Sequence, residues 1–170
     1  MNTLHKHVFI ALLAAQAILL SLIERLIPPV FAFAPGAKIG LANVVIIIAL
    51  YTLSTKDSFF LVVLRLLLAT LLGGTVMGLL YATVGGLLSF WGMLLLKRLP
   101  APHFSVVGIS AAGGFLHNLG QLVVAALLAK TWTILLYLPV LGSIGIVSGI
   151  LSGILAKLLL DKWPHLSHKS

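Results

Sequence analysis

Long apolar runs follow one another along this chain, separated by charged residues, prolines and pairs of glycines. These breaks divide the sequence into six apolar segments, which cover residues 8–27, 39–53, 59–72, 75–96, 104–129 and 133–160. A helix that crosses the hydrocarbon core of a bilayer needs about 20 apolar residues. Because the connections between the segments are short, the pattern predicts one all-α integral membrane domain over residues 1–170, a compact bundle of six transmembrane helices.

The second and third segments are the shortest. A run of about 14 residues reaches only about 21 Å as a helix. Such a helix has to thin the bilayer, or to be extended by a broken region around Gly73-Gly74. If either segment fails to span, every later connection changes sides, so the expected topology depends on both.

The composition supports a membrane protein. Hydrophobic residues make up 61% of the chain and charged residues 8%, against about 45–50% and about 25% in soluble domains. A soluble fold cannot cover its surface with so few charges, so the composition excludes a soluble globular enzyme and a disordered chain. The sequence has no cysteine, which excludes disulfides and thiolate chemistry.

The charges indicate an orientation. The chain has 11 basic and 3 acidic residues, and the basic ones stand singly or in pairs at the ends of apolar segments. This distribution is typical of membrane topology rather than of nucleic-acid binding. Six spans place seven basic residues on one side: Lys6, Lys56, Lys97, Arg98, Lys157, Lys162 and Lys169. The other side receives Arg25, Lys38 and Lys130. The positive-inside rule then predicts a multi-pass protein of the cell membrane with both termini in the cytoplasm.

The first segment carries small residues four apart, Ala11 and Ala15, with Ala14 and Ala17 beside them. The later residues 32–34 resemble a signal-peptidase site, but the preceding apolar stretch is longer than the core of a signal peptide, so we expect this segment to be retained. A face of small residues lets another helix approach closely. Ala11 and Ala15 therefore either pack inside the bundle or dock a partner membrane protein.

Small residues also recur in the fourth and sixth segments. The fourth carries Gly74, Gly78, Ala82 and Gly86, and the sixth carries Gly145, Gly149 and Gly153. In lipid, helices associate largely through close van der Waals packing at such positions. We expect these stripes to pack inside the bundle.

Three polar residues share one face of the fifth segment. His117 and Gln121 are four residues apart, and Asn118 and Gln121 are three apart, so all three project from about one turn. Counted from Phe104, His117 lies about 20 Å and Gln121 about 26 Å along the helix. This places the polar face in the outer half of the membrane.

Further polar residues flank the outer connection between the first two segments. Glu24 and Arg25 precede it, Lys38 and Asn43 follow it, and it contains three prolines. We expect these four residues to converge with the polar face of the fifth segment around one outward-facing pocket for a small molecule. The alternative is structural, because Asn, Gln and His hydrogen-bond between helices, and Glu24 can simply pair with Arg25 or Lys38.

Arg65 lies inside the third segment, about 9 Å from its inner end. Its head group can reach the cytoplasmic surface or pair with backbone carbonyls near the glycine break. Because this depth does not match the outer pocket, the sequence favours a structural or coupling role for Arg65.

Several kinds of chemistry are missing from the sequence. The three acidic residues, Glu24, Asp57 and Asp161, are far apart, so no paired carboxylates can hold Mg²⁺ against a diphosphate. There is no phosphate-binding loop for ATP. The histidines form no metal-binding cluster. The sequence therefore predicts a protein without a metal or cofactor that is not an enzyme.

Four motifs together resemble a known family. They are residues 24–28 (ERLIP), residues 35–43 (PGAKIGLAN), Arg65 with Gly73, and residues 117–121 (HNLGQ). The chain resembles, over about residues 8–160, the Gx transporter family, which is also called heptaprenyl diphosphate synthase component I. In layout it is similar to the substrate-binding S components of energy-coupling factor transporters.

The resemblance implies a six-helix S-component fold with a substrate pocket near the outer face. It also implies that Ala11 and Ala15 match an Ala-x-x-x-Ala pattern that meets a membrane coupling subunit, while separate cytoplasmic subunits hydrolyse ATP. Prenyl diphosphate synthases use Asp-rich Mg²⁺ motifs, and this chain has none. The synthase name therefore does not describe a catalytic subunit here.

Two functional hypotheses follow. The first is a substrate-binding component of an energy-coupling-factor-like importer for a vitamin-like or isoprenoid-related ligand. In this hypothesis Arg25, Lys38 and Asn43 hold its polar or anionic end, Glu24 lines the pocket, and His117, Asn118 and Gln121 donate and accept hydrogen bonds deeper in the site. The alternative is a non-catalytic membrane accessory subunit in polyprenyl diphosphate or quinone metabolism.

Overall fold

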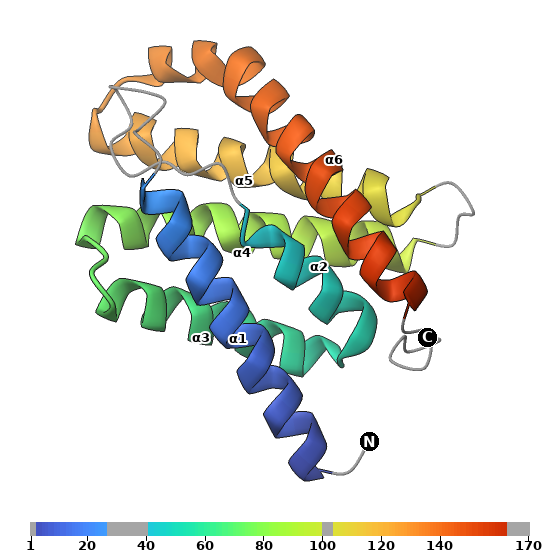
Figure 1. The fold of residues 1–170 in the computed structure, drawn as a ribbon. Coiled ribbons are helices and arrows are strands. Elements are labelled where there is room, and N and C mark those ends of the chain that lie inside the picture. The colour runs from blue at the N-terminus through green and yellow to red at the C-terminus, as the bar shows by residue number, and fades with distance from the viewer. Residues whose placement is uncertain (1–2, 27–40, 100–103, 163–170) are drawn as a thin grey trace.

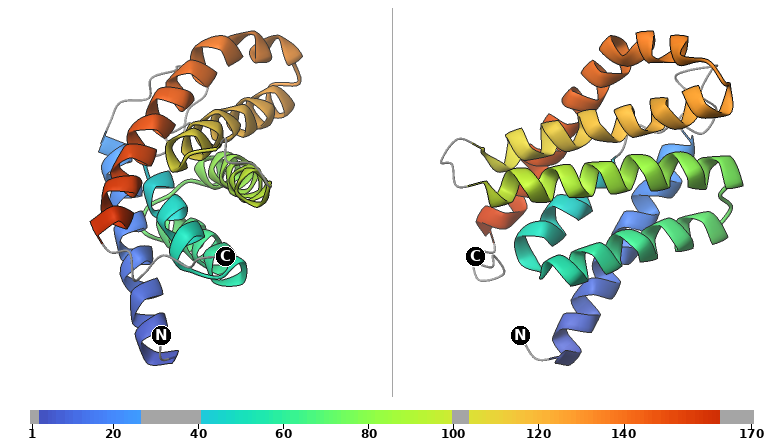
Figure 2. Two further views of the ribbon diagram at one scale, coloured as in Figure 1. Left: turned by 90° about the vertical axis from the view of Figure 1, so that its right-hand side faces the viewer. Right: turned by 180° about the vertical axis from the view of Figure 1, so that it is seen from behind.

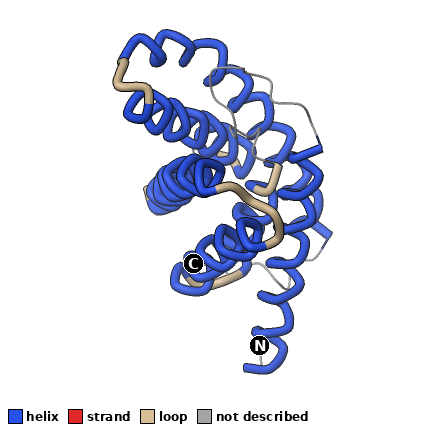
Figure 3. The backbone as a smooth tube through the Cα atoms, turned by 90° about the vertical axis from the view of Figure 1, so that its left-hand side faces the viewer, coloured by secondary structure: helices blue, strands red, loops and turns tan. Residues whose placement is uncertain are grey.

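Helices account for nearly all of the described chain. The computed structural model describes residues 3–26, 41–99 and 104–162, apart from the side chains of Thr3 and Arg25. Figure 3 shows that these residues are helical except for short connections. The elements are α1 (Thr3–Leu26), α2 (Asn43–Thr52), α3 (Thr55–Leu71), α4 (Val76–Arg98), α5 (Val106–Leu128), the 3₁₀ helix η1 (Trp132–Tyr137) and α6 (Leu138–Lys162). The all-α prediction is therefore confirmed for this part of the chain.

The α-helices form two layers (Figures 1 and 2). Helices α3, α4 and α5 lie side by side in one layer, and α1, α2 and α6 cross over it in the other. The main contacts follow this arrangement, with α4 between α3 and α5, and α6 packed on α5. The start of α1, the α2–α3 turn, the end of α4 and the end of α6 lie at the same end of the bundle. We call this end, which carries Lys6, Lys97, Arg98 and Lys162, the basic end.

The second apolar segment forms a short buried helix. Helix α2 has 10 residues, so it is about 15 Å long and only half as long as a hydrocarbon core is thick. It contacts each of the other five α-helices of the described chain, and every residue from Asn43 to Leu50 is buried. An apolar helix of this length is more typical of a buried core element than of a span. Its hydrophobicity reflects protein contacts on all sides.

Four parts of the described chain are long and apolar enough to cross a membrane. They are Leu4–Glu24, Val76–Arg98, Val106–Leu128 and Trp132–Lys162. Helix α3 has 17 residues and begins at Thr55, four residues before the expected start. Six full spans and cytoplasmic termini stay predictions.

Hydroxyl side chains set the starts of three helices. The N-cap residues Ser54, Thr75 and Ser105 each accept a hydrogen bond from the backbone N–H three residues later. These bonds satisfy N–H groups that the first helical turn leaves free. The α3–α4 turn contains Gly73 with φ of 102°, a conformation that glycine adopts at little cost.

Glycine contacts hold α4, α5 and α6 together. A Cβ atom at Gly145 would lie 2.4 Å from the Gly114 carbonyl oxygen, and one at Gly120 would lie 2.8 Å from Gly85 Cα. Gly149 and Gly153 meet the backbone of α5 at Ser110 and Val107. The packing expected for the sixth segment is confirmed. In the fourth, Gly85 rather than the predicted stripe makes the backbone contact with α5.

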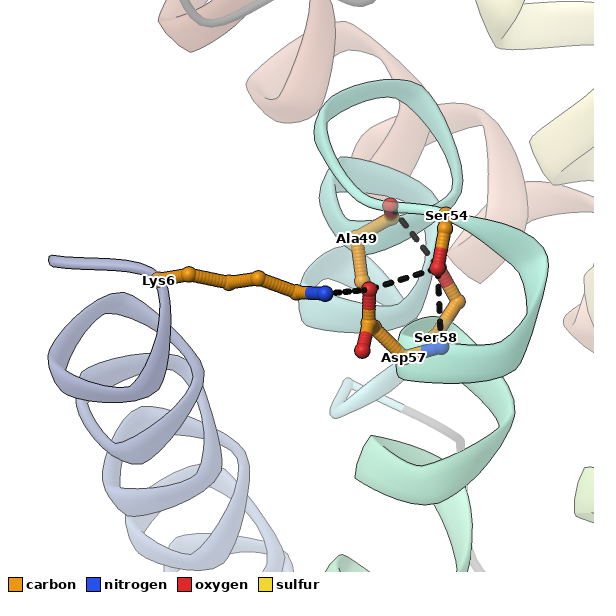
Figure 4. A network of polar contacts seen from close by, with 5 residues as sticks. All are labelled: Lys6, Ala49, Ser54, Asp57 and Ser58. Carbon is orange, nitrogen blue, oxygen red and sulfur yellow. Dashed lines mark hydrogen bonds and ion pairs between the residues drawn. The ribbon is translucent and has the colours of Figure 1, made fainter. Parts of the chain in front are cut away.

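An ion pair joins α1 to α3 at the basic end. Lys6 Nζ lies 2.6 Å from Asp57 Oδ2, which also accepts a 2.5 Å hydrogen bond from Ser54 Oγ. The Ser58 hydroxyl donates to the Ala49 carbonyl of α2 at 2.9 Å. Figure 4 shows this network. It fixes three helices where α2 turns into α3.

Two basic residues of α4 complete the basic end. Lys97 Nζ donates to the Leu50 carbonyl of α2 at 2.7 Å and lies 5.0 Å from the centre of the Tyr51 ring. Arg98 Nη2 donates to Thr55 Oγ1 at 3.3 Å. A cation is favoured at the C-terminal end of a helix, where carbonyl groups lack partners. Lys97 therefore stabilises the end of α2.

Candidate functional site

Six buried residues of the described chain have a charged, amide or imidazole side chain, and we call them the polar cluster. They are Glu24, Asn43, Arg65, His117, Asn118 and Gln121. The most exposed is Glu24, with 7% of its surface accessible. They come from α1 and α2 in one layer and from α3 and α5 in the other. Polar side chains inside a membrane protein are costly and often mark functional sites.

Glu24 connects the end of α1 to the start of α2. Its Oε1 accepts a 2.7 Å hydrogen bond from the backbone N–H of Leu41. The positive end of a helix dipole favours a carboxylate in this place. Asn43, the first residue of α2, is 3% exposed, and its Oδ1 has no hydrogen-bond partner among the described residues.

Arg65 belongs to this cluster. Because α3 begins at Thr55, Arg65 lies about 15 Å along the helix; its depth in the membrane stays a prediction. It is 4% exposed, so its head group does not reach the surface. A Cβ added at Gly86 would lie 3.6 Å from Arg65 Nη2, so α4 passes beside it without a side chain.

His117 and Gln121 form the part of the cluster on α5. Gln121 Nε2 and His117 Nε2 are 2.6 Å apart and share a hydrogen bond. A Cβ at Gly85 would lie 3.1 Å from His117 Nδ1 and 3.2 Å from Gln121 Cγ. The consecutive glycines Gly85 and Gly86 thus border the α5 pair and Arg65, respectively. The shared face predicted for these two α5 residues is present.

Asn118 has a structural contact. Its Nδ2 donates to the Leu141 carbonyl of α6 at 2.7 Å and lies against Gly145. An amide that bonds across a helix crossing stabilises that crossing. Asn118 therefore fits the structural alternative better than Gln121 does.

Two predicted site residues cannot be placed. Lys38 lies outside the described residues, and so does the proline-containing connection before it, while the side chain of Arg25 is not described. The structure brings Glu24 and Asn43 to adjoining helix ends, and the convergence of Arg25 and Lys38 with them stays a prediction. The sequence prediction left Arg65 out of the pocket, because the sequence of α3 alone does not show that this side chain is buried against other helices.

The described residues contain no group of three or more His, Asp or Glu side chains that could hold a metal ion. The polar cluster offers hydrogen-bond donors, acceptors and one guanidinium. In chemical terms this arrangement suits reversible binding of a polar group.

A family model settles the relationship of the chain. The model described as heptaprenyl diphosphate synthase component I matches residues 13–159. The chain belongs to this family. Comparison with curated proteins gave no match, and comparison with solved structures gave none. The resemblance drawn from the four sequence motifs is confirmed, and the family description names a component rather than a whole synthase.

Proposed function

We propose that this component I chain is the membrane substrate-binding component of an energy-coupling-factor-like importer. The observation that carries the proposal is the polar cluster, which is buried in a largely apolar bundle and retains an unpartnered acceptor at Asn43 Oδ1. A polar group without a partner in an apolar interior costs free energy. A ligand that supplies the missing donor removes that cost.

The proposed ligand is a small vitamin-like or isoprenoid-related molecule that enters from the outer face. Arg25 and Lys38 attract its polar or anionic end, and Glu24 and Asn43 line the entrance. His117 and Gln121 provide hydrogen bonds deeper in the bundle. In this proposal both termini and the basic end face the cytoplasm, in accord with the positive-inside rule.

The exposed face of α1 provides a docking surface in this proposal. Ala11 and Ala15 are exposed, whereas Ala14 and Ala17 are buried against the bundle. A flat small-residue face suits close approach by a helix of a membrane coupling subunit. Cytoplasmic ATPase subunits would then supply energy, since this chain has no phosphate-binding loop. Glu24 is on the same helix as the docking face, which links the ligand site to the partner.

Docking is tested by exchanging Ala11 and Ala15 for Trp. The chain is expressed with the coupling and ATPase subunits of its own cell, and co-purification is measured. We expect the double variant to lose the partners because the indole rings block close approach. Val147→Trp, on the exposed face of α6, is the control and should retain them. If the unaltered chain, the double variant and Val147→Trp all retain the partner subunits equally, the docking proposal is contradicted.

The site is tested by separating Gln121 from Asn118. Gln121→Leu should weaken retention of the co-purified ligand about tenfold or more, whereas Asn118→Leu should retain it. Each variant loses one buried hydrogen bond, to His117 or to Leu141, so each should lower the free energy of unfolding by about 1–2 kcal/mol. Retention is measured by mass spectrometry of the purified chain and stability by unfolding in detergent. If Gln121→Leu retains the ligand fully, the site is wrong.

The family description favours a second candidate. A component of a synthase could be a non-catalytic membrane subunit that binds a polyprenyl diphosphate or quinone precursor for a partner enzyme. The same co-purification experiment distinguishes the two candidates. The second candidate predicts that a prenyl-transferring enzyme, and not an ATPase module, co-purifies with the chain and is lost when Ala11 and Ala15 are exchanged for Trp.

A further inference from the structure

Arg65 is the most costly side chain of the polar cluster. It is 4% exposed, about 15 Å along α3, in a bundle of apolar helices. A buried guanidinium is normally retained where its donors are satisfied or where it has a function. Its Nε is buried and has no hydrogen-bond partner among the described residues. A purely structural role leaves this donor unexplained.

Glu24 does not explain the unsatisfied donor. Its Oε1 is bonded to the Leu41 N–H at 2.7 Å, at the helix end whose dipole favours a carboxylate. Glu24 Oε1 is therefore bonded at the start of α2, while Arg65 Nε has no partner among the described residues.

Helix α4 passes Arg65 with a glycine: a Cβ at Gly86 would lie 3.6 Å from Arg65 Nη2. Asn43, two residues after the Glu24-bound Leu41, contributes the unpartnered acceptor Oδ1. One donor on α3 and one acceptor on α2 are thus buried without partners among the described residues.

We propose that Arg65 binds an anionic group of the ligand, a carboxylate or a phosphate, while Asn43 Oδ1 accepts a hydrogen bond from a donor on the same ligand. The planar guanidinium matches the oxygen pairs of both anions. This inference rests on the proposed function, in which the polar cluster holds a ligand. In this proposal Arg25 and Lys38 attract the anion, and Arg65 binds it inside the bundle.

The test uses matched probes that differ in charge. The purified chain in a neutral detergent is titrated with geranyl diphosphate or geraniol, and with octanoate or octanol, while the unfolding temperature is followed. We expect the anionic member of one pair to stabilise the chain and its neutral counterpart to have no effect. The responding pair shows whether the anion is a phosphate or a carboxylate.

Variants assign the effect to Arg65. Arg65→Gln should weaken binding of the anionic probe by about 100-fold. Arg65→Lys keeps the charge but loses the paired donors, and should weaken binding about tenfold; it also serves if the Gln variant does not fold. Arg98→Gln removes the same group at the basic end and should bind normally.

Three results would overturn the assignment. They are equal stabilisation by the charged and neutral members, unchanged affinity in Arg65→Lys and Arg65→Gln, and no response to any of the four probes. The importer function is judged separately by co-purification of the coupling subunits, which requires no added ligand.

Discussion

The basic end and the polar cluster use similar side chains in opposite ways. At the basic end, Lys6 pairs with Asp57 and Lys97 donates to the end of α2. In the polar cluster, by contrast, Asn43 Oδ1 and Arg65 Nε are buried without partners among the described residues. The paired groups hold helices in place. The unpaired groups cost stability, which is reasonable where a ligand completes them.

The largest expected effect concerns the helix crossing beside the cluster. Gly145→Ala would bring a Cβ to 2.4 Å from the Gly114 carbonyl, so α5 and α6 must separate. We expect a loss of about 3 kcal/mol in the free energy of unfolding, or no folded protein in detergent.

Gly86→Ala is the matched control. Its Cβ would have ordinary contact distances of 3.6 Å to Arg65 and 4.0 Å to Leu66, so the unfolding free energy should change by less than about 1 kcal/mol. Equal losses in the two variants would show that the close contacts between α5 and α6 do not hold the bundle.

A smaller effect is expected at the end of α2. Lys97→Met removes the 2.7 Å bond to the Leu50 carbonyl and should lower the unfolding free energy by about 1–2 kcal/mol. Ligand binding should be unchanged because the polar cluster is not altered. Lys56→Met, an exposed change at the same end, should be nearly neutral. Loss of ligand binding in Lys97→Met would contradict the separation of the two regions.

The smallest effect is expected for the ion pair of α1 and α3. Lys6 and Asp57 are partly exposed, 37% and 21% by side chain, so a double-mutant cycle with Lys6→Gln and Asp57→Asn should give a coupling of about 0.2–1 kcal/mol. Higher salt should reduce it. A coupling above about 2 kcal/mol would show that this end is as desolvated as the cluster.

The hydrophobic pattern was sufficient to predict the helices but not their roles. It located all six apolar segments, yet α2 is hydrophobic on every side, and such a pattern does not distinguish a lipid-facing helix from one buried by five neighbours. The basic residues of this end could be identified from the sequence. The hydrogen bond from Lys97 to the Leu50 carbonyl could not, because it depends on how the end of α2 packs against α4.

The site was predicted in part for similar reasons. Residues three and four apart on one helix share a face, so His117 and Gln121 were recognised together. Arg65 was missed because its burial depends on how α3 packs against the other helices. The meeting of Gly85 with Gly120 depends on how α4 and α5 are rotated, which the sequence of either helix alone does not determine.

The most direct test of the account is native mass spectrometry of the chain purified from its own membrane in mild detergent. The central claim is that the polar cluster is a ligand site and the basic end a structural contact. The account predicts a discrete small-molecule adduct on the unaltered chain that persists in Lys97→Met and disappears in Gln121→Leu. An adduct of equal abundance in all three proteins, or none in the unaltered chain, would contradict it.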